Sequence, residues 1–152
     1  MMFSTKAEYG VRVMVHLAAS GTVGPVSLGA IAEAEGLPLA YLEHLAQRLR
    51  KADLVDSRRG AHGGYTLARP ATAISMAEVV EALEGDLAPI ECFSAGADGE
   101  PVCAREAQTD RACPTKLLWT RVQGSIVRTL QDMTLADLVQ DPTPVRAKAA
   151  AA

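Results

Sequence analysis

The sequence predicts a mainly α-helical protein with one small β-hairpin, and three observations support this fold class. Apolar residues recur at helical spacing in several segments that are separated by glycine and proline. Residues 54–68 instead have strand-forming residues at both ends, with glycines and arginines between them, as in a β-hairpin. The 152-residue chain is 49% hydrophobic but only 4% aromatic, so we expect one aliphatic core.

The first helix is expected at residues 5–20, where apolar side chains form a stripe at helical spacing. Thr5 and Glu8 are three residues apart and can form a capping box at its N-terminus. Arg12 lies one turn after Glu8, a spacing that allows an ion pair between them. His16 lies two turns after Glu8, on the same face of the helix.

Two shorter helices, residues 28–35 and 38–52, are expected to form a helix-turn-helix. Ser27 is a suitable N-cap for the first of them, and Gly36 can end it in the left-handed conformation. In such a pair the second helix usually enters the major groove of DNA. The predicted hairpin follows directly as a wing. Residues 1–70 are therefore predicted to be a winged helix-turn-helix DNA-binding domain.

The second half of the chain is expected to begin with a linking helix, residues 71–85, opened by a Ser-x-x-Glu capping box. Residues 86–114 hold all three cysteines and are rich in Gly, Ala and Asp, which predicts a loop. Residues 115–139 predict a long amphipathic helix that needs a partner surface. A second copy in a homodimer is the simplest partner, and packing on its own domain is the alternative. The Pro/Ala-rich tail, residues 140–152, is expected to be disordered.

The charge distribution favours a nucleic-acid partner although the net charge of −3 does not. Residues 41–70 hold six basic groups against three acids, whereas residues 71–114 hold nine acids against two basic groups. A local basic patch is what contact with phosphates requires. The alternative is that this basic helix face is merely solvated.

Base contacts are expected from the second helix of the helix-turn-helix. Glu43 can accept from cytosine N4, and Gln47 can bind adenine through two hydrogen bonds. Tyr41 and His44 are further base-edge candidates, and for Tyr41 the alternatives are a phosphate contact or a partly core position. Arginines are expected at phosphates or in the minor groove. The complete set of expected DNA-contacting residues is Tyr41, Glu43, His44, Gln47, Arg48, Arg58, Arg59, His62, Gly63 and Gly64.

Cys92, Cys103 and Cys113 are the only cysteines, and all lie in the predicted loop. Three thiols are an odd number for disulfides and one short of a four-coordinate metal site. The sequence contains nothing like a signal peptide or a membrane span, so a cytoplasmic location is expected. There thiols stay reduced, which favours metal binding or redox chemistry over structural disulfides.

An enzyme is not expected. The sequence contains no phosphate-binding loop, no dinucleotide fingerprint and no paired acid/base motif. A thiol nucleophile would need a histidine base. The three histidines lie outside the cysteine segment, in the first helix or in the segments expected to read DNA.

The sequence resembles the IscR/NsrR family of bacterial winged-helix regulators. Four motifs carry the resemblance, residues 4–10 (STKAEYG), 41–43 (YLE), 49–55 (LRKADLV) and 59–70 (RGAHGGYTLARP). The resemblance implies a sequence-specific transcription regulator, expected to act as a repressor. It implies a homodimer with crossed long helices and a palindromic double-stranded DNA operator. In many members it also implies an iron–sulfur cluster, either 2Fe–2S or 4Fe–4S. Some relatives lack the cysteines and bind no cluster.

The fourth cluster ligand is where this sequence departs from the family. Members of the cluster-assembly type carry a histidine three residues after the last cysteine, and Lys116 stands there instead. A protonated lysine has no lone pair to donate. In the nitric-oxide-sensing branch, a carboxylate of the first helix from the other subunit completes the cluster, and the matching residue here is Glu8. The gaps between the cysteines are also longer than in the best-known members.

Two mechanisms remain open at this stage. In the first, Cys92, Cys103, Cys113 and Glu8 hold a cluster whose state controls DNA affinity. The signal would then be iron–sulfur supply, redox state, nitric oxide or sulfur status. In the second, the cysteines act without a cluster, by oxidation or by binding zinc.

Overall fold

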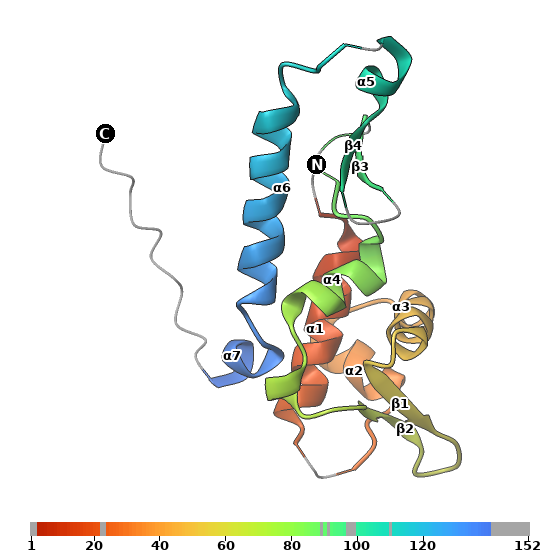
Figure 1. Ribbon diagram of the computed structural model, residues 1–152. Helices are drawn as coiled ribbons and strands as arrows, with labels where there is room; N and C mark the ends of the chain where they lie inside the picture. Colours follow the sequence, from red (N-terminus) through yellow and green to blue (C-terminus); the bar gives the residue numbers. More distant parts are fainter. Residues whose placement is uncertain are drawn as a thin grey trace.

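The computed structural model describes residues 3–21, 24–88, 90, 92–96, 100–109 and 111–140 (Figure 1). The N-terminal elements are α1 (Thr5–Ala19), α2 (Leu28–Glu35), α3 (Leu39–Lys51), β1 (Val55–Arg58) and β2 (Gly64–Leu67). They are followed by a 3-10 turn, η1 (Ala71–Ala73), and α4 (Met76–Glu84). The remaining elements are β3 (Phe93–Ala95), β4 (Pro101–Cys103), α5 (Ala104–Thr109), α6 (Lys116–Gln131) and α7 (Leu135–Gln140).

The helix-turn-helix and the wing form as predicted. The hydroxyl of Ser27 accepts a hydrogen bond from the Ala30 N–H at the start of α2, and Gly36 ends α2 with φ = 64°. Strands β1 and β2 pair antiparallel. The backbone of Tyr65 in β2 also exchanges two hydrogen bonds with Val26, so the wing is fastened to the segment that enters α2.

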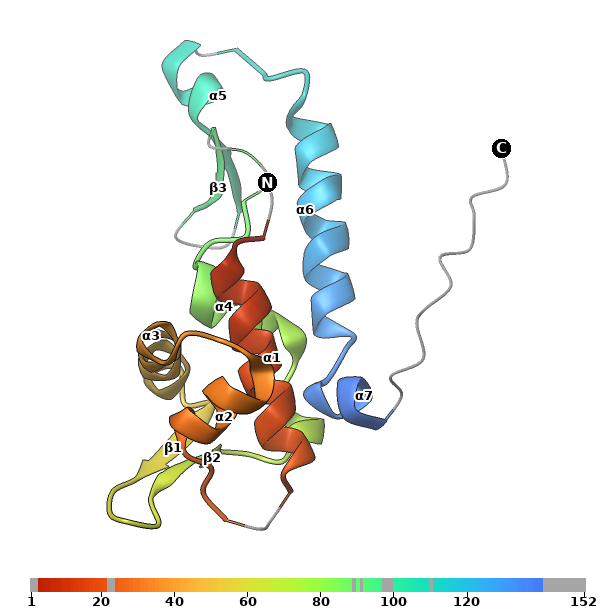
Figure 2. The same cartoon turned by 180° about the vertical axis from the view of Figure 1, so that it is seen from behind.

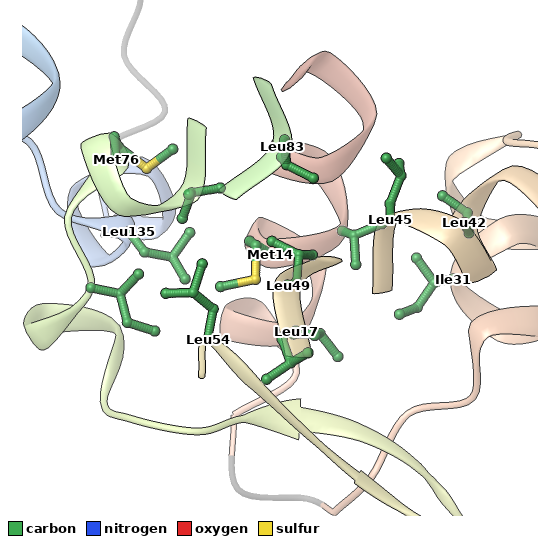
Figure 3. Close-up of a cluster of buried hydrophobic side chains, with 14 of the residues drawn as sticks. Met14, Leu17, Ile31, Leu42, Leu45, Leu49, Leu54, Met76, Leu83 and Leu135 are labelled. Carbon is green, nitrogen blue, oxygen red and sulfur yellow. The ribbon is translucent and has the colours of Figure 1, made fainter. Parts of the chain in front are cut away.

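Helix α1 lies at the centre of the molecule and contacts α2, α3, α4, α7 and β2. The wing and the hairpin β3–β4 lie at opposite ends of the molecule (Figures 1 and 2). The core between the helices is aliphatic, as the composition predicts (Figure 3). The largest fully buried side chains come from the N-terminal helices, from β1 and α4 with the segments beside them, and from α7, namely Val13, Met14, Ile31, Leu42, Leu45, Leu49, Leu54, Val55, Ile74, Leu83 and Leu135.

Two expectations about the first helix are wrong. Ser4, not Thr5, is the N-cap of α1, and its hydroxyl accepts from the Lys6 N–H at 3.1 Å. The carboxylate beside the cap comes from Glu84 at the end of α4, which accepts from the Ser4 amide at 2.8 Å and from its hydroxyl at 2.6 Å. A distant carboxylate therefore takes the position that the capping box assigned to Glu8.

The expected Arg12–Glu8 ion pair is also replaced by a tertiary contact. Arg12 pairs with Glu35 at the end of α2 at 3.0 Å, and His16 Nδ1 lies 3.0 Å from the other oxygen of the same carboxylate. Hydrogen bonding from His16 is the main cause that lowers the pKa of Glu35. The pairs join α1 to the turn of the helix-turn-helix, a contact that helical spacing alone does not reveal.

The C-terminal half differs from the prediction in two places. Residues 86–114 are not an irregular loop, because they contain the β3–β4 hairpin and α5. The helix predicted over residues 115–139 is two helices, α6 and α7, because residues 132–134 leave helical geometry and α7 turns into the core. The predicted disordered tail, residues 140–152, lies outside the described residues from residue 141 onward.

The close contact between α1 and α4 gives a stability prediction at Gly10. A Cβ atom built at Gly10 overlaps both methyl groups of Leu83, which is fully buried. Overpacking of this kind typically costs about 1–3 kcal/mol, while alanine gains at most about 1 kcal/mol in helix propensity. We therefore expect Gly10→Ala to lower the free energy of unfolding by up to about 2 kcal/mol in urea titrations. Gly29→Ala is the matched control, because the nearest atom to its added Cβ is 3.9 Å away. A higher stability of Gly10→Ala than of the wild-type protein would contradict this account.

Candidate nucleic-acid interface and cysteine segment

The side chains that α3 presents to solvent match those predicted to read DNA. Glu43, His44 and Gln47 are exposed, and the opposite side of the helix is buried through leucines of the core. A groove of 1340 Å³ runs beside α3, and its cationic lining comprises Lys6, Arg48, Arg50 and Lys51. The arrangement combines hydrogen-bonding groups suited to base edges with cations suited to phosphates.

Tyr41 is half-buried and serves the internal structure of the protein. Its ring packs edge-on against Tyr9 of α1, with 5.7 Å between ring centroids. Its hydroxyl lies 3.4 Å from the Thr5 hydroxyl. Of the roles that the sequence leaves open for Tyr41, the core role is the one for which the structure supplies contacts. Tyr41 also lines the groove beside α3, together with His44.

The two arginines of α3 have different partners. Arg48 Nη1 donates to the carbonyl oxygen of Leu83 in α4 at 3.2 Å. Arg50 Nη1 donates to the hydroxyl of Ser57 in the wing at 3.1 Å. Helix α3 is therefore tied to α4 on one side and to the wing on the other. Arg50 is a contact that the sequence reasoning did not single out.

The tip of the wing is exposed and carries side chains that are predicted to contact DNA. Arg58, Arg59 and His62 are all exposed. Gly63 and Gly64 are half-buried because the backbone passes close to other chain segments there. A Cβ at Gly63 would overlap the Arg58 carbonyl oxygen, and one at Gly64 would overlap the Val26 carbonyl. The structure therefore requires both glycines to shape the wing, whatever else they contact.

The three cysteines are distributed around the β3–β4 hairpin. Cys103 ends β4, pairs with Phe93 and is 4% exposed. Cys92 directly precedes β3 and is exposed, and its carbonyl oxygen accepts from the Ala104 N–H at 2.9 Å. Cys113 follows α5 and is half-buried. The hairpin therefore brings the backbone of Cys92 beside that of Cys103, although they are distant in sequence.

Glu106 of α5 organises the segment around the third cysteine. One carboxylate oxygen accepts from the Cys113 N–H at 2.8 Å, and the other accepts from Lys116 Nζ at 2.7 Å. The Lys116 hydrogen bond is the main cause that lowers the pKa of Glu106, and the same bond raises the pKa of Lys116. Sequence reasoning missed Glu106. The available signal was an acid between two cysteines, with a lysine just beyond the second.

The hydroxyl of Thr115 lies 3.3 Å from the sulfur of Cys113 and is the main cause that lowers the pKa of this thiol. A contact with the Cys103 side chain lowers the pKa further. Two of the three thiols are thus neighbours, and thiolates are the usual ligands of iron–sulfur clusters. Among the described residues, however, no three His, Cys, Asp or Glu side chains form a ready-made metal site. The donors fit the chemistry of a cluster, but completing a site requires Cys92 and a further ligand to join them.

Glu8 and His16 differ in how free they are to bind a metal. The carboxylate of Glu8 is exposed and forms no hydrogen bond or ion pair with any other residue that the structure describes. His16 is occupied by Glu35. The N-terminal end of α1, which carries Glu8, lies at the end of the molecule that holds the β3–β4 hairpin (Figures 1 and 2).

Helix α6 is only partly covered by its own chain. Val127 and Leu130, near its C-terminal end, pack against a cluster formed by Ala7, Val80 and Leu87. Near its N-terminal end, Leu117 and Leu118 are 63% and 55% exposed, and no residue of α6 is buried. The C-terminal end of the helix therefore packs on its own domain, as one of the two sequence-based alternatives states, and the homodimer contact stays a prediction for the exposed N-terminal end.

Within the described ranges, no helix is long and apolar enough to cross a membrane. The helix-turn-helix, the wing and the cationic surface beside α3 together define a winged-helix DNA-binding regulator. Comparison with known proteins identifies the family. Residues 3–141 match the profile of the Rrf2 family, described as an iron-dependent transcriptional regulator. The chain therefore belongs to the Rrf2 family.

Individual relatives agree with this assignment. The chain is 40% identical over 141 residues to protein rrf2 of Nitratidesulfovibrio vulgaris, covering 93% of this chain and 89% of the relative. Among solved structures, IscR of T. potens is 38% identical, with a TM-score of 0.75 and coverage of 96% and 91%. CymR, the global cysteine regulator of B. subtilis, is 36% identical, with a TM-score of 0.70 and coverage of 91% and 96%. The fold class and the resemblance to IscR-type regulators are confirmed, and the relatives are transcription regulators rather than enzymes.

Proposed function

We propose that this protein is a homodimeric repressor whose affinity for a palindromic operator is set by an iron–sulfur cluster. The ligands in this proposal are Cys92, Cys103 and Cys113 of one subunit and Glu8 of the partner subunit. The observation that carries it is the proximity of Cys103 and Cys113, with the Cys92 backbone hydrogen-bonded beside Cys103. The similarity to IscR of T. potens supports it.

The residues of the chain divide into a reading part and a sensing part. Glu43, His44 and Gln47 would contact base edges, while Arg58 and Arg59 would contact phosphates or the minor groove. Gly63 and Gly64 would act indirectly, because they allow the close backbone contacts that shape the wing and so position its arginines. Exposed Glu8 extends the sensing part to α1, which packs against α3. A bound cluster would connect the cysteine segment of one subunit to α1 of the partner subunit. Its presence depends on the iron supply, and its charge depends on its oxidation state.

Glu106 and Lys116 have a supporting role in this proposal. Lys116 does not bind metal, because its ammonium has no lone pair and is bonded to Glu106. Glu106 instead fixes the backbone of Cys113, so that the thiol stays near Cys103. Second-layer hydrogen bonds of this kind orient metal ligands and are needed for tight binding.

Anaerobic purification followed by native mass spectrometry tests the proposal, because it counts subunits and irons together. We expect a dimer that carries a cluster and absorbs at about 420 nm, a band typical of cluster chemistry. Operator binding is then compared for the cluster-loaded and cluster-free protein at one salt concentration. Equal affinities would exclude control by the cluster.

A second candidate function is a regulator that uses the thiols without a cluster. The lowered pKa of Cys113 beside Cys103 favours it, because thiolates are the reactive form of cysteine. The similarity to CymR of B. subtilis, a cysteine regulator, also supports it. Colourless anaerobic protein would favour this candidate. Native mass would then show bound zinc, or oxidation would produce a Cys103–Cys113 disulfide that changes operator affinity.

Arg59 gives a prediction specific to DNA contact. We expect Arg59→Ala to weaken operator binding and to lower the slope of log affinity against log salt by about one, since one phosphate contact is lost. Fluorescence anisotropy titrations at several salt concentrations measure this slope. Arg128→Ala is the control, because Arg128 is an exposed arginine near the C-terminal end of α6, the end that packs on its own domain. An unchanged slope in Arg59→Ala would show that Arg59 does not contact phosphate.

A further inference from the structure

Arg48 is predicted from the sequence to contact DNA, but its guanidinium has an internal partner. It donates to the carbonyl oxygen of Leu83 at 3.2 Å, in the last turn of α4. The last four carbonyls of a helix lack partners within the helix, and a cation at this end is favoured by the helix dipole. Arg48 is therefore a side-chain cap for α4, supplied by the helix expected to read DNA.

The last turn of α4 is held on its other side by α1. The Leu83 side chain fills the space left by the missing side chain of Gly10. The neighbouring carboxylate of Glu84 accepts two hydrogen bonds from Ser4 and lies 3.5 Å from Lys6 Nζ. A displacement of this turn would therefore change its contacts with both α1 and α3.

The segment that carries the cysteines begins directly after the last turn of α4. Helix α4 ends at Gly85. Leu87, which is 3% exposed, packs with Ala7 of α1 and Val80 of α4. Cys92 follows Leu87 by five residues, and Glu8 follows Ala7 directly. Both proposed sources of cluster ligands are thus connected to the turn that Arg48 caps.

We propose that Arg48 is a positioning residue that transmits the state of the cysteine segment to α3 through the last turn of α4. This inference rests on the proposed function, because it concerns how that site controls DNA binding. Displacing the turn would move or release the Arg48 guanidinium and so change how α3 is presented to DNA. Two sites that bias one structural element are what allosteric coupling requires.

Arg48→Gln tests the proposal, with Arg50→Gln as the matched control on the same helix. Operator affinity is measured for the cluster-loaded and cluster-free forms of each protein at several salt concentrations. For Arg48→Gln we expect the ratio of the two affinities to fall at least about fivefold, the lower end of typical allosteric coupling. Its salt slope should stay unchanged, and Arg50→Gln should keep the wild-type ratio. A retained ratio, or a slope lowered by about one as for a phosphate contact, would overturn the proposal.

Hydrogen exchange on DNA-free, cluster-free protein separates this inference from the proposed function. We expect Arg48→Gln to accelerate exchange in residues 83–88 and in the last turn of α3, with Arg48→Lys partly restoring protection. Unchanged exchange would show that Arg48 does not hold the turn, even if cluster control of DNA binding is real. Equal affinities of the two wild-type forms, with accelerated exchange in Arg48→Gln, would instead reject cluster control and the transmitting role while leaving the cap in place.

Discussion

Leu118→Glu is expected to make the protein monomeric and to weaken operator binding about 100-fold or more. Leu117 and Leu118 are large apolar side chains exposed on α6, whereas the other end of this helix packs on its own domain. In the proposed homodimer, a second copy of α6 covers this surface, and a buried unpaired carboxylate there would be strongly unfavourable. Linking two DNA-binding domains typically raises the affinity for a two-part site about 100-fold or more over that of one domain. A monomer lacks this gain.

Sedimentation velocity and operator titration measure the two consequences of Leu118→Glu separately. Gln131→Glu is the matched control, since it adds the same charge at an exposed position of the same helix. Circular dichroism must show that the variant keeps its helices. A folded, dimeric Leu118→Glu protein would mean that the exposed end of α6 is not the dimer interface. A monomer with unchanged operator affinity would mean that the protein does not read a two-part operator as a dimer.

The sequence was most informative where a signal is local. Ser27 and Gly36 bound α2 as expected, and the Ser75–Glu78 capping box forms in full at the start of α4. The break before α7 also has a local signal in the sequence, a Thr-x-x-Asp pattern that the prediction of one long helix did not use. Thr134 and Asp137 form a cap in which the carboxylate accepts from the amide and hydroxyl of Thr134.

Contacts between distant segments could not be predicted in this way. Glu84 caps α1 from 80 residues away, and Arg12 pairs with Glu35 of α2 rather than with its helical neighbour. Both acids were indistinguishable in sequence from acids on a solvated face, because only the tertiary fold brings them to their partners. The β3–β4 hairpin was missed because its strands are three residues each, too short for a period-two pattern.

Glu8 does not form the capping box that the sequence predicts. From the sequence, a capping box with Thr5 explained this residue as well as metal binding did. In the structure, Ser4 and Glu84 occupy the N-terminus of α1, and the Glu8 carboxylate is exposed without a described partner. The capping-box explanation for an acid at this position is therefore gone, and two explanations remain, a favourable interaction with the N-terminal end of the α1 dipole and the proposed ligand role.

Mixed dimers give the decisive test of ligation by Glu8 across the dimer. Neither Glu8→Ala nor Cys103→Ser is expected to hold a cluster as a homodimer, because each lacks a ligand in both sites. A heterodimer of the two variants has one complete site if Glu8 acts across the interface. That site combines the three cysteines of the Glu8→Ala subunit with Glu8 of the partner subunit. We therefore expect one cluster in the mixed dimer and none in either parent.

Differently tagged subunits, co-expressed and purified by both tags, provide the mixed dimer, and native mass spectrometry counts its clusters. Ligation within one subunit predicts none, because the Glu8→Ala subunit lacks the carboxylate and the other lacks a thiol. A cluster in the Glu8→Ala homodimer would show instead that Glu8 is dispensable. In that case Glu106 is the next carboxylate to test, since it already lies at the Cys113 amide. The cluster count thus separates ligation across the dimer, ligation within a subunit and a different fourth ligand.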